Sequence, residues 1–333
     1  MMTVILHSLA DPAVIRALWL GALIALTSAV AGVFVIIRGQ SFAGHVLTDI
    51  GVTGASGAYL IGQSAWYGFI GFGIMAGAGI EAIGDKIRNR DIATGIALSF
   101  SLGIGALFLY LDTRIAGGAS AAQLVLFGSL FAVQSKLVPL IALVSLVSLI
   151  LIGVLYRPLL LSSLSPEVAA AKGVSVRIMS LLFMLALAIT VENSALVIGA
   201  LMSTALLIGP ASAAVHLTRR PHRALFLAGL IGVLILCAGV VLADMSVFFP
   251  PRGQGWPVSF FIAVLVFLVV LMTSLFTRSR NGRRGLRKHS SREDDLAQDN
   301  KSDSSHDHAR DNIQDANSNH GLSGNGLQQE GSQ

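Results

Sequence analysis

The sequence predicts an all-α protein: a polytopic transmembrane helical bundle of about 8–9 spans, followed by a disordered C-terminal tail. Of its 333 residues, 54% are hydrophobic and only 12% are charged. A soluble globular domain has roughly twice that charged fraction. The apolar residues come in runs of about 20, the length that an α-helix needs to cross the hydrocarbon core. A transmembrane β-barrel would instead show short segments of alternating hydrophobicity.

Taken in order, about nine segments are long and apolar enough to span a bilayer. They are 13–37, 45–62, 66–83, 91–111, 137–156, 176–191, 195–217, 222–243 and 258–276. The stretch 120–133 is apolar but too short to span comfortably, so we expect a re-entrant or short packed helix. Residues 1–278 form the predicted transmembrane domain. Residues 279–333 contain almost nothing apolar to bury, so we expect a disordered cytoplasmic tail.

The basic residues of the loops fall into two sets, on opposite sides of the predicted membrane. The larger set contains Arg38, Lys86, Arg88, Arg90, Arg157, Lys172, Arg177, Arg219, Arg220, Arg223 and the run from Arg278 to Lys288. The smaller set contains Arg16, Arg114, Lys136 and Arg252. By the positive-inside rule the larger set is cytoplasmic, which places the N-terminus outside and the C-terminus in the cytoplasm. The net charge of +5 therefore indicates membrane lipid as a partner and not nucleic acid.

The first candidate site is a pair of ionisable residues between apolar segments, in the sequence RGQSFAGHVLTDIGVTGASGAYLIG. His45 and Asp49 are four residues apart, so on a helix they share one face. Such residues at membrane depth are costly unless they are paired or serve a pathway. The pair is either a set of metal ligands on an internal route or a structural tie between two helices. Cys237 is the only cysteine, which excludes a disulfide framework and a cysteine-based zinc site.

Other ionisable residues are weaker candidates. Glu192 lies in the sequence VENSA between two predicted helices, where we expect a solvated carboxylate in an external turn. Asp244 ends a predicted helix on the external side, either as an ordinary helix-end carboxylate or as a third ligand reaching towards the pair. The histidines of the tail have no spacing that fixes a metal geometry, so a solvated tail is the simpler interpretation. They are His289, His306, His308 and His320.

The longest cytoplasmic loop contains a predicted short helix. Ser165 suits the N-cap and Pro166 the first helical position, while Glu167 favours the positive end of the helix dipole. Ala169 belongs to the alanine run that continues the helix, and Gly173 closes it. This element is either an ordinary loop helix or a docking element for a cytoplasmic partner.

A predicted helix break lies in the segment 195–217. Pro210 removes a backbone donor next to Gly209, which weakens the helix there. A kinked or broken helix at membrane depth is tolerated where it lines a cavity or is buried in protein. The Gly209–Pro210 pair therefore marks either a break in a pore-lining helix or a kink in an ordinary packing helix.

Three segments together resemble the permease subunits of ABC transporters that import zinc, manganese or iron(II), the ABC-3 family. The segment VFVIIRGQSFAGHVLTDIGVTGASGAYL resembles the family's arginine, its Ser-Phe/Leu-x-Gly-Asp-x-x-x-His stretch and the small-residue helix that follows. LSPEVAAAKGV is similar to the family's Asp-Pro-Glu-x-Ala-x-x-x-Gly coupling segment. VIGALMSTALLIGPASAA is similar to its run ending in Ile-x-Pro-Ala-x-x-Ala. The resemblance covers about residues 13–276 and leaves out the tail.

The resemblance implies a metal transit site at His45 and Asp49. The family's Asp falls on His45 and its His on Asp49, so the two residue types are exchanged on one helix face. One imidazole and one carboxylate remain, a pair suited to Zn²⁺, Mn²⁺ or Fe²⁺ as a transported ion, with no permanently bound cofactor. The family's second ligand cluster falls near Asp244, where this chain has no histidine.

The resemblance also implies a non-catalytic subunit of an ATP-driven importer in the inner (cell) membrane. A homodimer of permease chains would form the pore, cytoplasmic ATP-binding subunits would dock on it, and an extracytoplasmic metal-binding protein would deliver the ion. In the ATPase-coupling segment Ser165 replaces the family's Asp, whereas Glu167, Ala169 and Gly173 match. The chain has no Gly-x-x-x-x-Gly-Lys-Ser/Thr loop, so hydrolysis belongs to a separate chain.

Two other functional classes are considered alongside this one. A proton-coupled secondary transporter of metal ions or another small solute would use His45, Asp49 and Glu192 as a relay, with no ATPase. An intramembrane enzyme is disfavoured because the HExxH and GxSxG motifs are both missing.

Overall fold

The computed structural model describes residues 11–83, 87–115, 125–128, 130–131, 133–218, 220–246 and 255–277. The predictions about the tail 279–333 and its histidines lie outside these residues, as do those about the loop cations Lys86, Arg219 and Arg252. The described chain is helical and contains no strand. Its helices are α2 (Pro12–Ile37), α3 (Ser41–Leu60), α4 (Ala65–Ile83), α5 (Ile87–Ile115), α7 (Val138–Val154), α8 (Tyr156–Leu164), α9 (Pro166–Ala171), α10 (Val176–Ile198), α11 (Ala200–Leu217), α12 (Pro221–Met245) and a last helix, Val258–Thr277.

Every predicted membrane segment overlaps a helix, but the predicted segment 195–217 begins on α10 and crosses the interruption at Gly199 before it continues as α11. Six of the described helices are long and apolar enough to cross a membrane, or seven if the bent pair α7 and α8 forms one span. α3 and α4 are not among the six. The helical membrane fold is therefore confirmed, whereas the count of about 8–9 spans stays a prediction.

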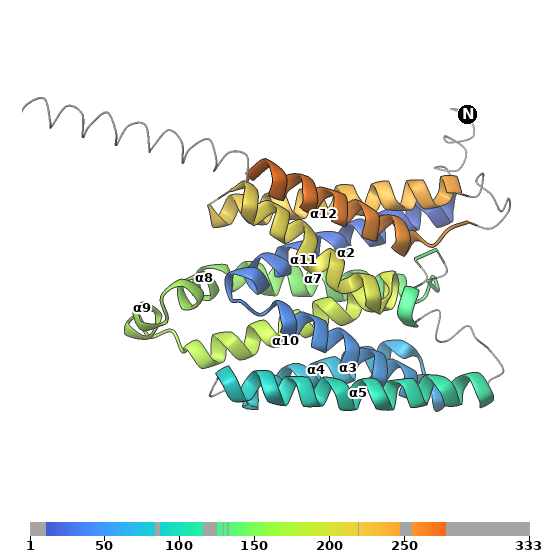
Figure 1. The fold of residues 1–333 in the computed structure, drawn as a ribbon, viewed down its shortest axis with the longest axis horizontal. Helices are drawn as coiled ribbons and strands as arrows, with labels where there is room; N and C mark the ends of the chain where they lie inside the picture. The colour runs from blue at the N-terminus through green and yellow to red at the C-terminus, as the bar shows by residue number, and fades with distance from the viewer. Residues whose placement is uncertain are drawn as a thin grey trace, which may run out of the picture. The chain divides into compact units, whose positions relative to one another are not determined.

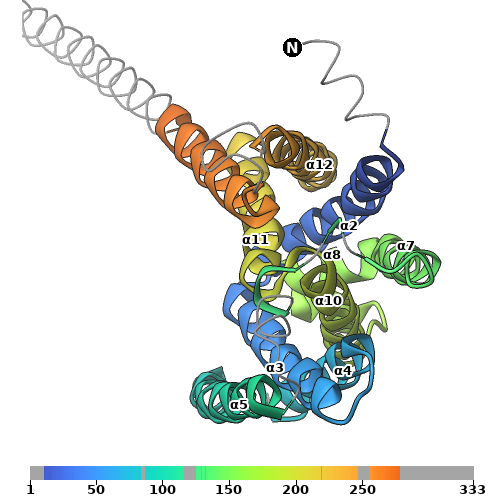
Figure 2. The same cartoon turned by 90° about the vertical axis from the view of Figure 1, so that its right-hand side faces the viewer.

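The helices of the bundle form two groups that α10 joins (Figure 1). α2 packs against α11, α12 and α7, while α3 packs against α4 and α5. α10 contacts α4 and α3 in one group and α11, α7 and α2 in the other. Figure 2 looks along the helices and shows α10 between the two groups. A side chain on α10 can therefore reach both groups.

Glycines allow the closest approaches between these helices. A Cβ added to Gly68 on α4 would lie 2.1 Å from the Gly54 oxygen of α3, and one added to Gly54 would lie 2.3 Å from the Gly68 oxygen. On α2, a Cβ added to Gly32 would lie 1.8 Å from the Leu207 oxygen of α11. Small residues let helix backbones pack closely in membranes. Larger side chains at these positions would push the helices apart.

The chain is interrupted at Gly199, between α10 and α11. Gly199 has φ of 100° and ψ of 148°, a conformation that favours glycine, and a Cβ there would lie 2.3 Å from the carbonyl carbon of Phe127. α11 continues through Gly209 and Pro210, so the break predicted there is wrong. Pro210 is buried, and neighbouring helices make a proline inside a membrane helix tolerable.

The described part of the stretch 120–133 packs inside the protein. Val125 and Leu130 are buried. Ser259 on the last helix donates a hydrogen bond to the Phe127 oxygen at 2.7 Å. These contacts show that the described part of the stretch is packed against other helices, and the choice between a re-entrant and a short packed helix stays a prediction.

Candidate metal site

His45 and Asp49 lie together on α3, as their spacing predicted. His45 Nε2 is 3.5 Å from Asp49 Oδ2, in the geometry of a pair one helical turn apart. The His45 side chain is 53% exposed and the Asp49 side chain 17%. At about 1.5 Å per residue, Asp49 lies about 12 Å along the axis from the start of α3. The pair is therefore well inside the helix and open on one side.

The pair offers one imidazole and one carboxylate, ligands that Mn²⁺, Fe²⁺ and Zn²⁺ all accept. Among the described residues, no three His, Cys, Asp or Glu side chains lie close enough to hold a metal ion. An ion at His45 and Asp49 would thus keep water or ligands from another chain in its remaining positions. Such a site can bind an ion and release it again.

Asp244 does not join this pair. It lies near the end of α12 and lines a separate cavity of about 560 Å³, together with Asp11 and Trp256. The loop residues 247–254, which follow the end of α12, lie outside the described residues. In this conformation Asp244 is therefore a helix-end carboxylate beside a different cavity.

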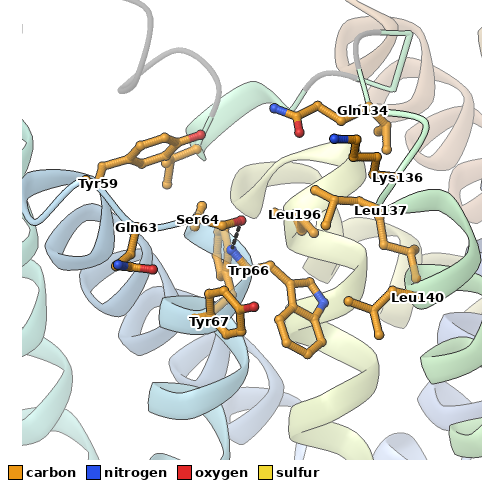
Figure 3. A pocket seen from close by; sticks show the side chains of 16 residues that line it. Tyr59, Gln63, Ser64, Trp66, Tyr67, Gln134, Lys136, Leu137, Leu140 and Leu196 are labelled. Atoms are coloured by element: carbon orange, nitrogen blue, oxygen red, sulfur yellow. Dashed lines mark hydrogen bonds between the residues drawn. The ribbon is translucent and has the colours of Figure 1, made fainter.

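A larger cavity, of about 680 Å³, lies at the end of the bundle where α3 ends and α7 begins. Figure 3 shows Tyr59 and Gln63 on one side of it and Gln134 and Lys136 on the other. Its lining contains no carboxylate and no imidazole among the described residues. Lys136 adds a positive charge to a lining that is otherwise largely apolar; we call this cavity the polar vestibule after its Gln63, Gln134 and Lys136 side chains.

The prediction from sequence was wrong for Glu192, which we expected as a solvated carboxylate in an external turn. It lies inside α10 and not in an external turn, and its residue is fully buried. Neither carboxylate oxygen has a hydrogen-bond partner among the described residues. A partial signal was available: the predicted segment 176–191 has only about 16 residues, which is short for a span. Extending it through VENSA would have placed Glu192 at membrane depth.

Polar side chains on either side of Glu192 tie α10 to its neighbours. Asn193 Nδ2 donates to the Ile141 oxygen at 3.1 Å and to Ser145 Oγ at 2.8 Å, both on α7. Ser203 Oγ on α11 donates to the Val191 oxygen at 3.0 Å. The last third of α10 is thus held to α7 and α11 by hydrogen bonds.

The predicted loop helix is present as α9. Pro166 begins it, and Ser165 stands at the N-cap without a side-chain hydrogen bond to the helix. The backbone oxygen of Ser165 accepts the Ala169 N–H at 3.0 Å, and Ala169 is buried. Gly173 follows with φ of 76°, and its N–H donates to the Ala170 oxygen at 3.0 Å. Glu167 is exposed in the first turn.

Arg38 connects the end of α2 to the region of α8 and α9. Its guanidinium lies 5.2 Å from the ring centroid of Phe183 on α10. It also donates to Ser163 Oγ of α8 at 3.4 Å. The end of α2, the end of α8 and the first half of α10 therefore meet at one end of the bundle, away from the polar vestibule.

Comparison with known proteins gives three findings. Residues 10–274 match the family described as the ABC 3 transport family. The chain is 28% identical over 226 residues to "Manganese transport system membrane protein MntC" of Listeria innocua serovar 6a, covering 68% of this chain and 79% of that protein. It is 30% identical to the protein of the same name in Halalkalibacterium halodurans, covering 68% and 76%. Among solved structures it is similar to "PsaBC from Streptococcus pneumoniae in complex with Fab", with a TM-score of 0.67 and 22% identity over 82% of this chain and 95% of that chain.

Proposed function

Because the chain belongs to the ABC 3 transport family, we propose that it is the permease subunit of an ATP-driven importer of divalent metal ions. The two relatives named for manganese transport favour Mn²⁺ as cargo. The imidazole and carboxylate of the candidate site also suit Fe²⁺ and Zn²⁺. Membership of this family replaces the secondary-transporter and enzyme hypotheses.

The observation that carries this proposal is the exposed His45–Asp49 pair. A half-exposed imidazole within a membrane helix is costly against lipid. Its open face must therefore meet water or another protein chain. A second copy of the permease on this face would enclose the pair and create a polar route between the two chains. This is why we infer a homodimer with the pair along its pore.

The rest of the transporter follows from the two ends of the bundle. We assign the end that holds Arg38 and α9 to the cytoplasm, because basic loops concentrate there. The exposed α9 would dock a separate ATP-binding subunit. The polar vestibule beside Lys136 would open to the outside, where a metal-binding protein delivers the ion. Hydrolysis would rock the dimer and expose His45 and Asp49 to each side in turn.

The test is ATP-dependent uptake of radiolabelled Mn²⁺, Zn²⁺ and Fe²⁺ into vesicles that hold the permease, its ATPase and its binding protein. We expect His45→Ala and Asp49→Ala each to lower uptake at least about tenfold, since each removes a ligand. The matched control is the double variant His45→Asp with Asp49→His, which keeps both ligands in the reverse order. We expect it to retain uptake. Undiminished transport by both alanine variants would make the pair structural.

A further inference from the structure

Arg38 lies between the proposed docking helix and the helix that carries the candidate metal site. α9 packs against α8 and α10, and α8 in turn packs against α2. Gly39 and Gln40 are the two residues that separate Arg38, at the end of α2, from the start of α3. His45 is the fifth residue of α3, about 6 Å along its axis from the first. A displacement of α8 and α9 can therefore reach the candidate site along a short path that includes Arg38.

The Arg38 guanidinium contacts two of these helices at once. Its central carbon lies 5.2 Å from the ring centroid of Phe183 on α10, within the range of a cation–π contact, and Phe183 is buried. Its Nη1 atom donates to Ser163 Oγ on α8 at 3.4 Å. A planar guanidinium can stack on a ring while its edge donates hydrogen bonds, whereas the compact ammonium of lysine is a point charge. The side chain of Arg38 therefore suits a position between a ring and a hydroxyl group.

Aromatic side chains hold the same junction one turn before Arg38. Phe34 on α2 is fully buried, and its ring meets that of Tyr156, at the start of α8, edge to face with centroids 6.0 Å apart. The Phe34 ring also lies 6.2 Å from the Phe183 ring. Because α8 bends by 58° from α7, it lies against the end of α2 and meets it near both of its own ends, at Tyr156 and at Ser163. The end of α2 is thus tied to α8 and to α10.

We propose that Arg38 is a positioning residue that couples the docking helix to the transit site, because it transmits a displacement of α8 and α9 to the start of α3. The inference rests on the proposed function and deepens it: Arg38 is the residue through which ATP hydrolysis would move His45 and Asp49. Gly39, with φ of 65°, lets the chain turn between α2 and α3. A shift at Arg38 is therefore passed on within two residues.

Two other roles of Arg38 give different predictions. If Arg38 only stabilises the fold, its variants should yield less folded permease but transport normally for each ATP hydrolysed. If only its positive charge matters, as in the positive-inside rule, Arg38→Lys should behave like the wild type. If the planar guanidinium positions the helices, Arg38→Gln and Arg38→Lys should both lower uptake for each ATP while folding persists.

The matched control is Arg16→Gln. Arg16 also belongs to α2, and it donates to Ser135 Oγ at 2.7 Å, at the opposite end of the bundle from Arg38. This variant removes an arginine that ties α2 to another segment without touching α8, α9 or the start of α3. We expect it to keep the wild-type ratio of uptake to hydrolysis.

The experiment measures ATP-dependent Mn²⁺ uptake and ATP hydrolysis by the assembled transporter in the same vesicles, with the yields of folded permease and of copurified ATPase. We expect Arg38→Gln to lower the ratio of uptake to hydrolysis at least fivefold and Arg38→Lys at least threefold, with both yields within twofold of the wild type. Phe183→Leu removes the aromatic face, so it should lower the ratio on its own but have less than a twofold further effect in the Arg38→Gln background, because both changes break one contact.

A wild-type ratio in Arg38→Gln or in Arg38→Lys would overturn the inference, and so would full multiplication of the separate effects of Arg38→Gln and Phe183→Leu. If Arg38→Gln fails to fold, Arg38→Lys decides, since it keeps the charge. Loss of folded permease in both variants would assign Arg38 to stability and would also overturn the inference. A wild-type transporter that takes up no divalent ion would instead overturn the proposed function, so the two failures are distinguishable.

Discussion

A transit site needs few ligands, because an ion that is bound too tightly cannot leave. As the proposed ligands, His45 and Asp49 would meet this need with one imidazole and one carboxylate, which lie 3.5 Å apart on one face of α3. Positions 45 and 49 lie on the same face of α3 whether the histidine or the aspartate occupies the first of them. Compared with the family's Asp-x-x-x-His order, this chain therefore keeps both ligand types. A metal ion would meet the imidazole and the carboxylate in the opposite order along the helix.

The glycine contact between α3 and α4 gives a prediction at the scale of single residues. Gly68→Ala would push a methyl group into the Gly54 oxygen at 2.1 Å, an overpacking that costs about 1–3 kcal/mol. Gly71→Ala on the same helix meets nothing within 4 Å and removes a flexible glycine, so its effect should be neutral or slightly stabilising. Thermal unfolding of the purified permease in detergent measures both. Equal unfolding temperatures for the two variants would show that the contact tolerates an added methyl group.

The part of the candidate site that lies within one helix could be predicted from sequence, whereas the contacts between helices could not. His45 and Asp49 are one turn apart on one helix, so local geometry alone predicts their pairing. Glu192 lies in the niche beside Gly51 and Gly73 only because α10 packs against α3 and α4. No local pattern encodes that packing. Its acidic side chain instead favoured a loop, which led to the wrong prediction of an external turn.

At the scale of elements, the helices were predictable and their interruptions were not. Apolar runs about 20 residues long predict membrane helices directly, and all the predicted runs except 195–217, which crosses from α10 to α11, lie mainly on a single helix. The interruption depends on the backbone conformation at Gly199, where φ is 100° and an added Cβ would collide with the backbone of Phe127. Gly209 next to Pro210 looked the stronger breaker in sequence. Buried packing holds α11 together there.

The exposed helix α9 gives a testable prediction about the docking of the ATP-binding subunit. If the ATP-binding subunit docks on it, Glu167→Lys should reverse a charge at the interface and weaken copurification of that subunit, while the permease itself folds normally. Arg177→Glu is the matched control, because it reverses an equally exposed charge at the start of α10, outside α9. Loss of the ATPase in both variants, or in neither, would remove α9 as its specific docking element.

At the scale of the whole molecule, exposed apolar surface and charge act together. α5 and the last helix, Val258–Thr277, are apolar and largely exposed, as expected for helices that face lipid. In the described part of the chain, Arg157, Lys172 and Arg177 lie on α8, at the end of α9 and at the start of α10, at the end of the bundle with Arg38, whereas Arg16 lies beside Ser135 and Lys136 at the opposite end. Apolar runs in the sequence predict which segments span the membrane, and the uneven distribution of basic residues predicts which end of the bundle is cytoplasmic. The way two such chains meet depends on surfaces that sequence patterns do not describe.

The orientation gives the last prediction, which two exposed serines at opposite ends of the bundle can test. In a Cys237→Ser background, Ser64→Cys lies beside the polar vestibule and Ser175→Cys lies between α9 and α10. By the positive-inside rule, a membrane-impermeant maleimide should label the Ser64→Cys variant in intact cells and the Ser175→Cys variant only after permeabilisation. The reverse result would turn the vestibule towards the cytoplasm and α9 towards the outside. A cytoplasmic ATPase could not then reach α9, so this measurement would also decide whether the docking prediction can hold.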